Sequence, residues 1–131
     1  MTDRHPSGPP ADRARLAGTL LAAIRLVNGT AGLLAPELLL RRLGADATTG
    51  RFGVYPFRMF GIRTILIGAD LLVLRGAEHR RAVRRAVLIH ASDTVSAVVA
   101  GIRGDLPRKA AVTTTAISGV NTILAVLAAR E

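Results

Sequence analysis

The sequence contains no cysteine and no tryptophan, and only 3% of its 131 residues are aromatic. Without cysteine, disulfide bonds and thiolate chemistry are excluded. Of the histidines His5, His79 and His90, only His90 lies in an apolar stretch. We therefore expect no metal site and no cofactor, because a structural zinc ion needs four nitrogen or sulfur ligands. Nucleic acid is not an expected partner either, because basic residues and stacking aromatics do not alternate here.

Acidic residues are also scarce: 9 Asp and Glu stand against 18 Lys and Arg, a net charge of +9. The charges lie mainly in short clusters between long apolar stretches. Half of the residues are hydrophobic, and the mean hydropathy is +0.36. A lipid bilayer requires such segregation of charge from apolar sequence. We therefore predict an all-α integral membrane protein whose basic clusters bind anionic lipid headgroups.

Four apolar stretches are long enough to cross a membrane, since about 20 helical residues cover a hydrocarbon core of ~30 Å. Pro36 ends the first stretch and begins a short helix over 36–43, which is expected to lie at the interface. The basic run 75–85 is expected to continue as helix into the third span. We predict a disordered tail over 1–14 and one four-helix transmembrane domain over 15–131. The expected spans are 16–35, 56–74, 86–102 and 110–129.

The distribution of basic residues predicts an orientation. Four spans place both termini on one side of the membrane. Nine basic residues lie near the membrane on the terminal side and seven lie on the opposite side, and the run 75–85 supplies five of the nine. The positive-inside rule therefore predicts a multi-pass protein of the inner cell membrane with cytoplasmic termini.

Each expected span carries polar residues that lipid would exclude. A charged group at a helix centre costs about 2.5 to 3.5 kcal/mol on the translocon scale, so we expect these groups to face inward and pair. Small residues share their helical faces, which allows close packing between helices. Residue depth predicts two layers, a central one and a second one toward the terminal side. The central layer would contain Arg25, Arg63, Asp93 and Asn121, the second layer would contain Asp70 and His90, and Asn28 and Ser118 complete the polar set.

Three interpretations of this polar set remain open. The Arg and Asp groups could lock four helices in register, hold a ligand or catalytic centre, or form a proton path. As acid–base groups we single out His90, Asp93 and Asp70. The remaining polar residues would bind a ligand or serve structure. We expect binding of a small amphiphile or a partner helix; the alternatives are a membrane-embedded acid–base enzyme of isomerase or cyclase type and a small proton-linked transporter. A second copy of the chain is a further candidate partner.

Several short motifs resemble a known family. They are Arg25-x-x-Asn28-Gly29 followed by Pro36, then Phe60-Gly61-x-Arg63 with Gly68, then His90-x-x-Asp93. This pattern resembles a group of small bacterial and fungal membrane proteins classed as a domain of unknown function, number 4267. The resemblance covers about residues 15–130. It implies four membrane helices and no particular reaction or ligand.

Overall fold

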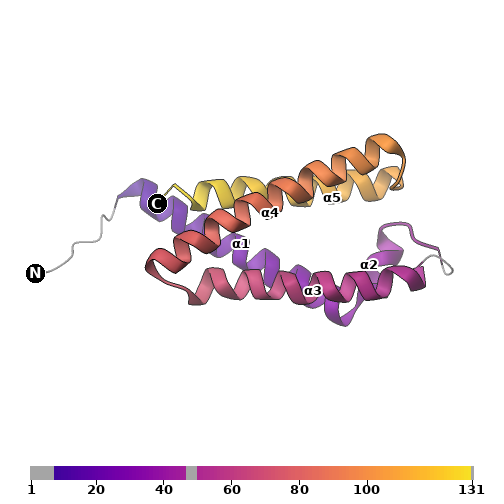
Figure 1. The fold of residues 1–131 in the computed structure, drawn as a ribbon, viewed down its shortest axis with the longest axis horizontal. Helices are drawn as coiled ribbons and strands as arrows, with labels where there is room; N and C mark the ends of the chain where they lie inside the picture. Colours follow the sequence, from indigo (N-terminus) through magenta and orange to yellow (C-terminus); the bar gives the residue numbers. More distant parts are fainter. Residues whose placement is uncertain (1–7, 47–49, 131) are drawn as a thin grey trace, which may run out of the picture.

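The computed structural model describes residues 8–46 and 50–130, which form five helices and no strand (Figure 1). The helices are α1 (Pro9–Leu34), α2 (Pro36–Arg42), α3 (Gly50–Val73), α4 (Gly76–Arg103) and α5 (Arg108–Ala128). The predicted all-α class is confirmed. Three of these helices, α1, α4 and α5, are long and apolar enough to cross a membrane. Helix α3 is not among the three, and it carries Arg58, Arg63 and Asp70 in its apolar part.

The predicted N-terminal tail is too long. Helix α1 begins at Pro9, so residues 9–14 are helical, while residues 1–7 lie outside the described part of the chain. Pro9 and Pro10 occupy the first helical positions, where a missing N–H and a fixed φ are favourable. The polar and proline-rich composition of this segment led to the prediction of disorder, although prolines at the first positions of a helix are compatible with it. Pro36 ends α1 as predicted, because the residue before a proline avoids helical geometry, and Ala35 has φ −132° and ψ 49°.

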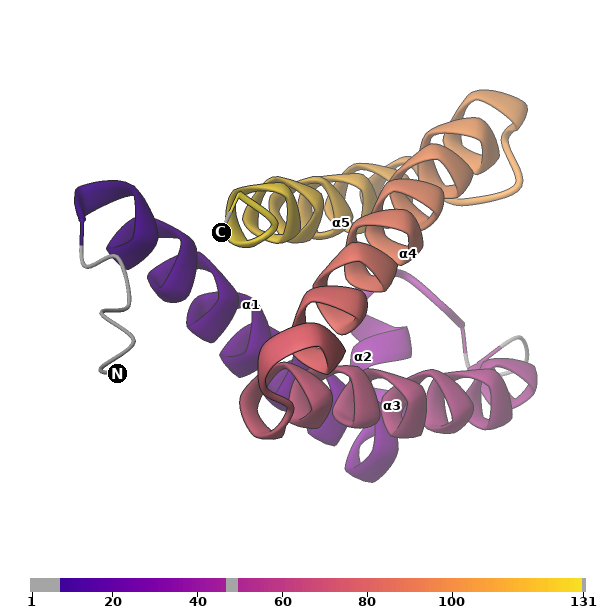
Figure 2. The ribbon, with the colours of Figure 1, turned by 60° about the vertical axis from the view of Figure 1, so that its left-hand side comes forward.

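The helices form two antiparallel pairs, α1 with α3 and α4 with α5 (Figures 1 and 2). Helix α5 also packs on α1, and α2 rests on α3. Contact between α3 and α4 is slight, and both views show α4 diverging from α3 beyond their shared turn. The start of α1, the C-terminus and the α3–α4 turn lie at one end of the molecule.

Small side chains fill the interior and large apolar ones face outward. The core consists mainly of alanines around Leu21, which is fully buried. By contrast Val27, Leu66 and Ile102 are 68%, 61% and 82% exposed. A soluble protein would bury such side chains, whereas a membrane protein turns them toward lipid and packs its helices through small residues. The packing therefore agrees with the three membrane-span candidates.

Glycines set the distance between α1 and α3. A methyl group built on Gly61 would lie 2.6 Å from the carbonyl oxygen of Gly29 and 2.6 Å from the amide nitrogen of Leu33. These are backbone atoms, which cannot move aside without moving the helix. The predicted small faces are confirmed here, since Gly29, Gly32, Gly61 and Gly68 are all buried. This close approach brings polar side chains of the two helices into contact.

Candidate functional site

Arg25 projects from α1 and is held by side chains of α3. Only 2% of its surface is exposed. Its Nη2 donates a hydrogen bond to Thr64 Oγ1 at 3.2 Å, and its guanidinium carbon lies 5.7 Å from the centre of the Phe60 ring. A cation over an aromatic face is attracted by the ring quadrupole. The Nε of Arg25 is buried and has no hydrogen-bond partner among the described residues.

Asp93 on α4 lies between two basic side chains. Its Oδ1 is 3.6 Å from Arg63 Nη2, and its Oδ2 is 4.0 Å from His90 Nδ1. Both distances exceed that of a direct hydrogen bond. The side chains of Arg63 and Asp93 are 55% and 32% exposed, so the pair is accessible from outside the chain. This arrangement connects α3 to α4 only loosely, which weakens the interpretation that the pair serves to lock the helices.

His90 and Asn121 are buried without full hydrogen bonding. His90 is completely buried, and neither ring nitrogen has a hydrogen-bond partner among residues 8–46 and 50–130. Asn121 on α5 is 1% exposed, and its Oδ1 also lacks a partner there. An unpaired buried polar group costs about 1 to 3 kcal/mol, so these atoms have hydrogen-bonding capacity that the described residues do not use.

A threonine pair connects α4 with α5 beside these residues. The hydroxyls of Thr94 and Thr122 lie 3.1 Å apart, and each also lies close to a carbonyl of its own helix, 2.7 Å from His90 and 2.8 Å from Ser118. Because a hydroxyl has one proton, one threonine donates across to the other, which donates to the carbonyl of its own helix.

The structure brings together part of the predicted polar set. Arg25, Arg63, His90 and Asp93 lie close enough for their charges to act on one another. We call these four residues with Asn121 the interior cluster. Ser118 is also buried, one turn before Asn121.

Two predicted residues lie outside the interior cluster. Asp70 is exposed and makes no side-chain hydrogen bond or ion pair with a described residue, so the predicted Asp70–His90 layer does not form. His90 pairs with Asp93 instead, because both lie on α4 one turn apart and share a face. Asn28 is half-buried and likewise makes no side-chain hydrogen bond within the described part of the chain.

Sequence reasoning missed the roles of Phe60, Thr64 and Thr122. Phe60 packs on Arg25, with its ring centre 5.7 Å from the guanidinium carbon. Phe60, Thr64 and Gly68 recur at four-residue spacing and therefore share one face of α3. That spacing could have placed them opposite Arg25, because Gly61 on the same side marks the contact with α1.

The charges of the interior cluster do not cancel. Arg25 and Arg63 supply two positive charges, and among the described residues one carboxylate acts on both: Asp93, which forms an ion pair with Arg63. The described residues contain no group of three His, Asp or Glu side chains that could hold a metal ion. The chemistry of the cluster therefore suits an anionic or hydrogen-bonding group.

Comparisons with protein-family models, curated proteins and solved structures give no match. The resemblance to the domain-of-unknown-function family 4267 therefore stays a prediction. The class supported by the fold and packing is an all-α membrane protein with a partly buried polar cluster.

Proposed function

We propose that this chain is a four-span protein of the inner cell membrane that binds a small amphiphile with an acidic head at the interior cluster. The observation that carries this proposal is the coexistence of buried, unpartnered polar atoms with an accessible ion pair. Arg25, His90 and Asn121 supply the unpartnered atoms, and Arg63 and Asp93 supply the accessible pair. A ligand head that accepts hydrogen bonds and carries negative charge would satisfy Arg25 and balance the excess charge.

The fourth span would be α3. Its 24 residues measure about 36 Å, which exceeds the ~30 Å hydrocarbon core. It packs antiparallel along α1, itself a span candidate, through close glycine contacts. Its apolar part is interrupted by Arg58, Arg63 and Asp70, and of these Arg63 has a partner in Asp93.

Single cysteines test this topology, because the natural chain has none to interfere. We expect Glu37→Cys to react with a membrane-impermeant maleimide from one side, and Ala77→Cys and Ala129→Cys from the other side. All three positions are exposed at helix ends. Labelling of Glu37→Cys and Ala77→Cys from the same side would show that α3 does not cross the membrane.

Ligand binding is tested with oleate, and oleyl alcohol serves as its uncharged analogue. We expect oleate to bind the purified protein in nonionic detergent more tightly than oleyl alcohol, as measured by native mass spectrometry. The variant Arg63→Gln should weaken oleate binding about tenfold, because one charge-assisted contact is lost.

Arg58→Gln is the matched control. It removes the same charge from an exposed position on the same helix, outside the interior cluster. Its affinity for oleate should stay close to that of the natural chain. Equal weakening by both variants, or equal binding of oleate and oleyl alcohol, would contradict the proposed site.

A membrane-embedded acid–base enzyme is the second candidate. It is favoured by His90, whose Nδ1 faces Asp93 Oδ2 at 4.0 Å and whose ring nitrogens have no hydrogen-bond partner among the described residues. An imidazole oriented by a carboxylate is a common arrangement for proton transfer. The proton-linked transporter stays a prediction, and the exposed position of Asp70 lends it no support.

A further inference from the structure

A cavity lies at the end of the molecule that carries the C-terminus and the α3–α4 turn. Its volume is about 870 Å³, and it is bounded by the start of α1, the end of α3 and the start of α4. We call it the terminal pocket. It is separate from the interior cluster, since Arg15 at its wall precedes Arg25 by ten residues, about 15 Å along α1.

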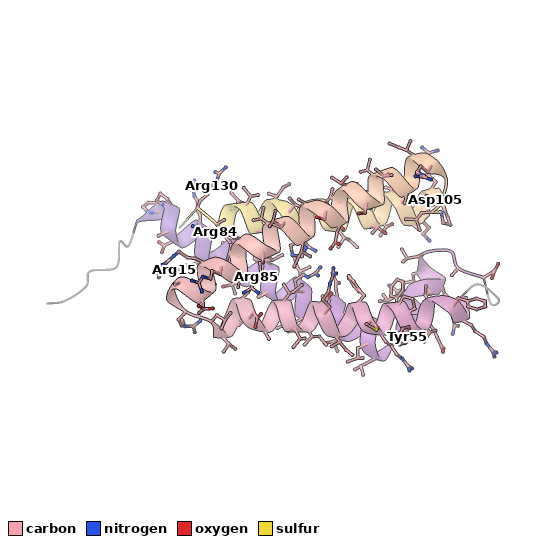
Figure 3. All side chains as sticks on the ribbon, viewed as in Figure 1. Arg15, Tyr55, Arg84, Arg85, Asp105 and Arg130 are labelled. Carbon is pink, nitrogen blue, oxygen red and sulfur yellow. The ribbon has the colours of Figure 1, made fainter. Side chains whose placement is uncertain are left out.

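The described residues that line the terminal pocket bring only basic charges to it. They include Arg15, Arg75, Arg80 and Arg130 together with His79, and no Asp or Glu of residues 8–46 and 50–130. Figure 3 shows Arg15, Arg84, Arg85 and Arg130 gathered at this end, with Asp105 at the opposite end. Arg84 also lines a small adjoining cavity that shares His79 and Arg80. Basic side chains from four segments of the chain thus converge on one volume.

Two of these arginines, Arg80 and Arg130, are not neutralised by any acidic group that the structure describes. Arg80 and Arg130 form no hydrogen bond or ion pair with any residue that the structure describes. Glu78, close by on α4, is paired with Arg81 at 2.9 Å. The Nη1 of Arg75 donates to the carbonyls of Leu72 and Leu74, which fixes its guanidinium beside the pocket. The charges of Arg80 and Arg130 lie at one pocket without a described partner, so a bound anion would stabilise this end.

The pocket also offers an apolar wall and further hydrogen-bonding groups. Leu71 and Leu72 of α3 and Leu74, just after it, line the pocket together with Ala14 and Gly18 of α1. The Nδ1 of His79 is buried without a hydrogen-bond partner among the described residues. Helix α4 begins at the pocket with no side-chain cap, so its first amides add partial positive charge. A basic rim above an apolar wall matches a molecule with an anionic head and an apolar body.

We propose that the terminal pocket binds a phosphate group, carried by a membrane lipid or by a soluble phosphate ester. Guanidinium groups bind phosphate oxygens through paired, charge-assisted hydrogen bonds, which favours phosphate over a smaller anion. Basic pockets between membrane helices are known places for phosphate headgroups. The leucine wall would lie beside the first carbons of an acyl chain.

Native mass spectrometry of the full chain in nonionic detergent tests this site with two phosphate sources. The probes are dioleoyl phosphatidic acid and glycerol 3-phosphate, and dioleoyl phosphatidylcholine is the zwitterionic comparison. We expect phosphatidic acid to bind more tightly than phosphatidylcholine. The double variant Arg80→Gln/Arg130→Gln should weaken binding of whichever of the two phosphate probes binds the natural chain more tightly, at least about tenfold.

The matched control is Arg58→Gln/Arg108→Gln, which removes the same net charge from exposed positions near the opposite end. This control should keep the affinity of the natural chain for both probes. Tighter binding of phosphatidic acid than of glycerol 3-phosphate would support a lipid as the source, and the reverse would support a soluble ester. The proposal would be overturned if both double variants lost the same affinity for the phosphate probes. It would also be overturned if the protein bound phosphatidic acid no more tightly than phosphatidylcholine and did not bind glycerol 3-phosphate.

Discussion

Gly61→Ala is expected to lower the free energy of unfolding by about 3 kcal/mol. The added methyl group would lie 2.6 Å from the Gly29 carbonyl oxygen and the Leu33 amide nitrogen, and both are backbone atoms of α1. These steric clashes can be relieved only if α1 and α3 move apart. Separation lengthens the Arg25–Thr64 hydrogen bond, which already measures 3.2 Å. The measurement is thermal unfolding of the purified protein in detergent.

Gly119→Ala serves as the control for this substitution. It makes the same chemical change within helix α5, where a methyl group would meet no atom within 4 Å. Alanine favours a helix over glycine by up to about 1 kcal/mol, so this variant should be as stable as the natural chain or slightly more stable. If Gly61→Ala behaved like Gly119→Ala, the close crossing of α1 and α3 would be wrong.

Arg25→Met is expected to weaken oleate binding strongly while leaving the fold intact. The guanidinium is buried with a single side-chain hydrogen bond and an unpartnered Nε, so its charge is poorly compensated. Replacing a buried charge by an apolar side chain of similar volume is often neutral or stabilising. We therefore expect an unfolding temperature equal to or above that of the natural chain. Oleate affinity should fall at least about thirtyfold, because a charged hydrogen bond contributes about 2 kcal/mol.

The opposite pattern would identify Arg25 as a structural residue. In that case Arg25→Met would unfold at a clearly lower temperature and retain its affinity for oleate. Arg25→Lys distinguishes charge from shape, because lysine keeps the positive charge but not the planar guanidinium. Tighter oleate binding by Arg25→Lys than by Arg25→Met would support the charge as the recognised feature.

The sequence was sufficient for most of the helices and for the inward face of α1, although it placed the start of α1 too late and expected Arg63 and Asp70 to face inward. Apolar length predicted the helices that became α1, α3, α4 and α5, because a bilayer imposes a minimum span. Pro36 marked the break between α1 and α2. Small residues at helical spacing identified the buried side of α1, where Gly18, Ala22, Arg25 and Gly29 are indeed buried. These features depend on steric and solvation effects that act within a single segment of the chain, so the sequence of that segment is enough to predict them.

The pairing of the polar residues could not be predicted in the same way. Counting depth along straight, parallel spans placed Asp70 level with His90, but Asp70 is exposed and His90 faces Asp93. Depth along a helix does not determine the side of the helix on which a residue lies in the assembled bundle. The rotation of α3 is set by the contact of Gly61 with Gly29, which directs Thr64 toward α1 and leaves Asp70 outside.

The sequence alone determined that this protein is helical, apolar in long stretches and polar at a few interior positions. The tertiary structure decided which of those polar positions meet. It brought Arg25 onto Phe60, left His90 and Asn121 buried without full hydrogen bonding, and gathered arginines from distant segments around the terminal pocket. The physical reason is that composition and periodicity determine the structure within one helix. Contacts between side chains of different helices depend on how closely and at what angle the helices cross.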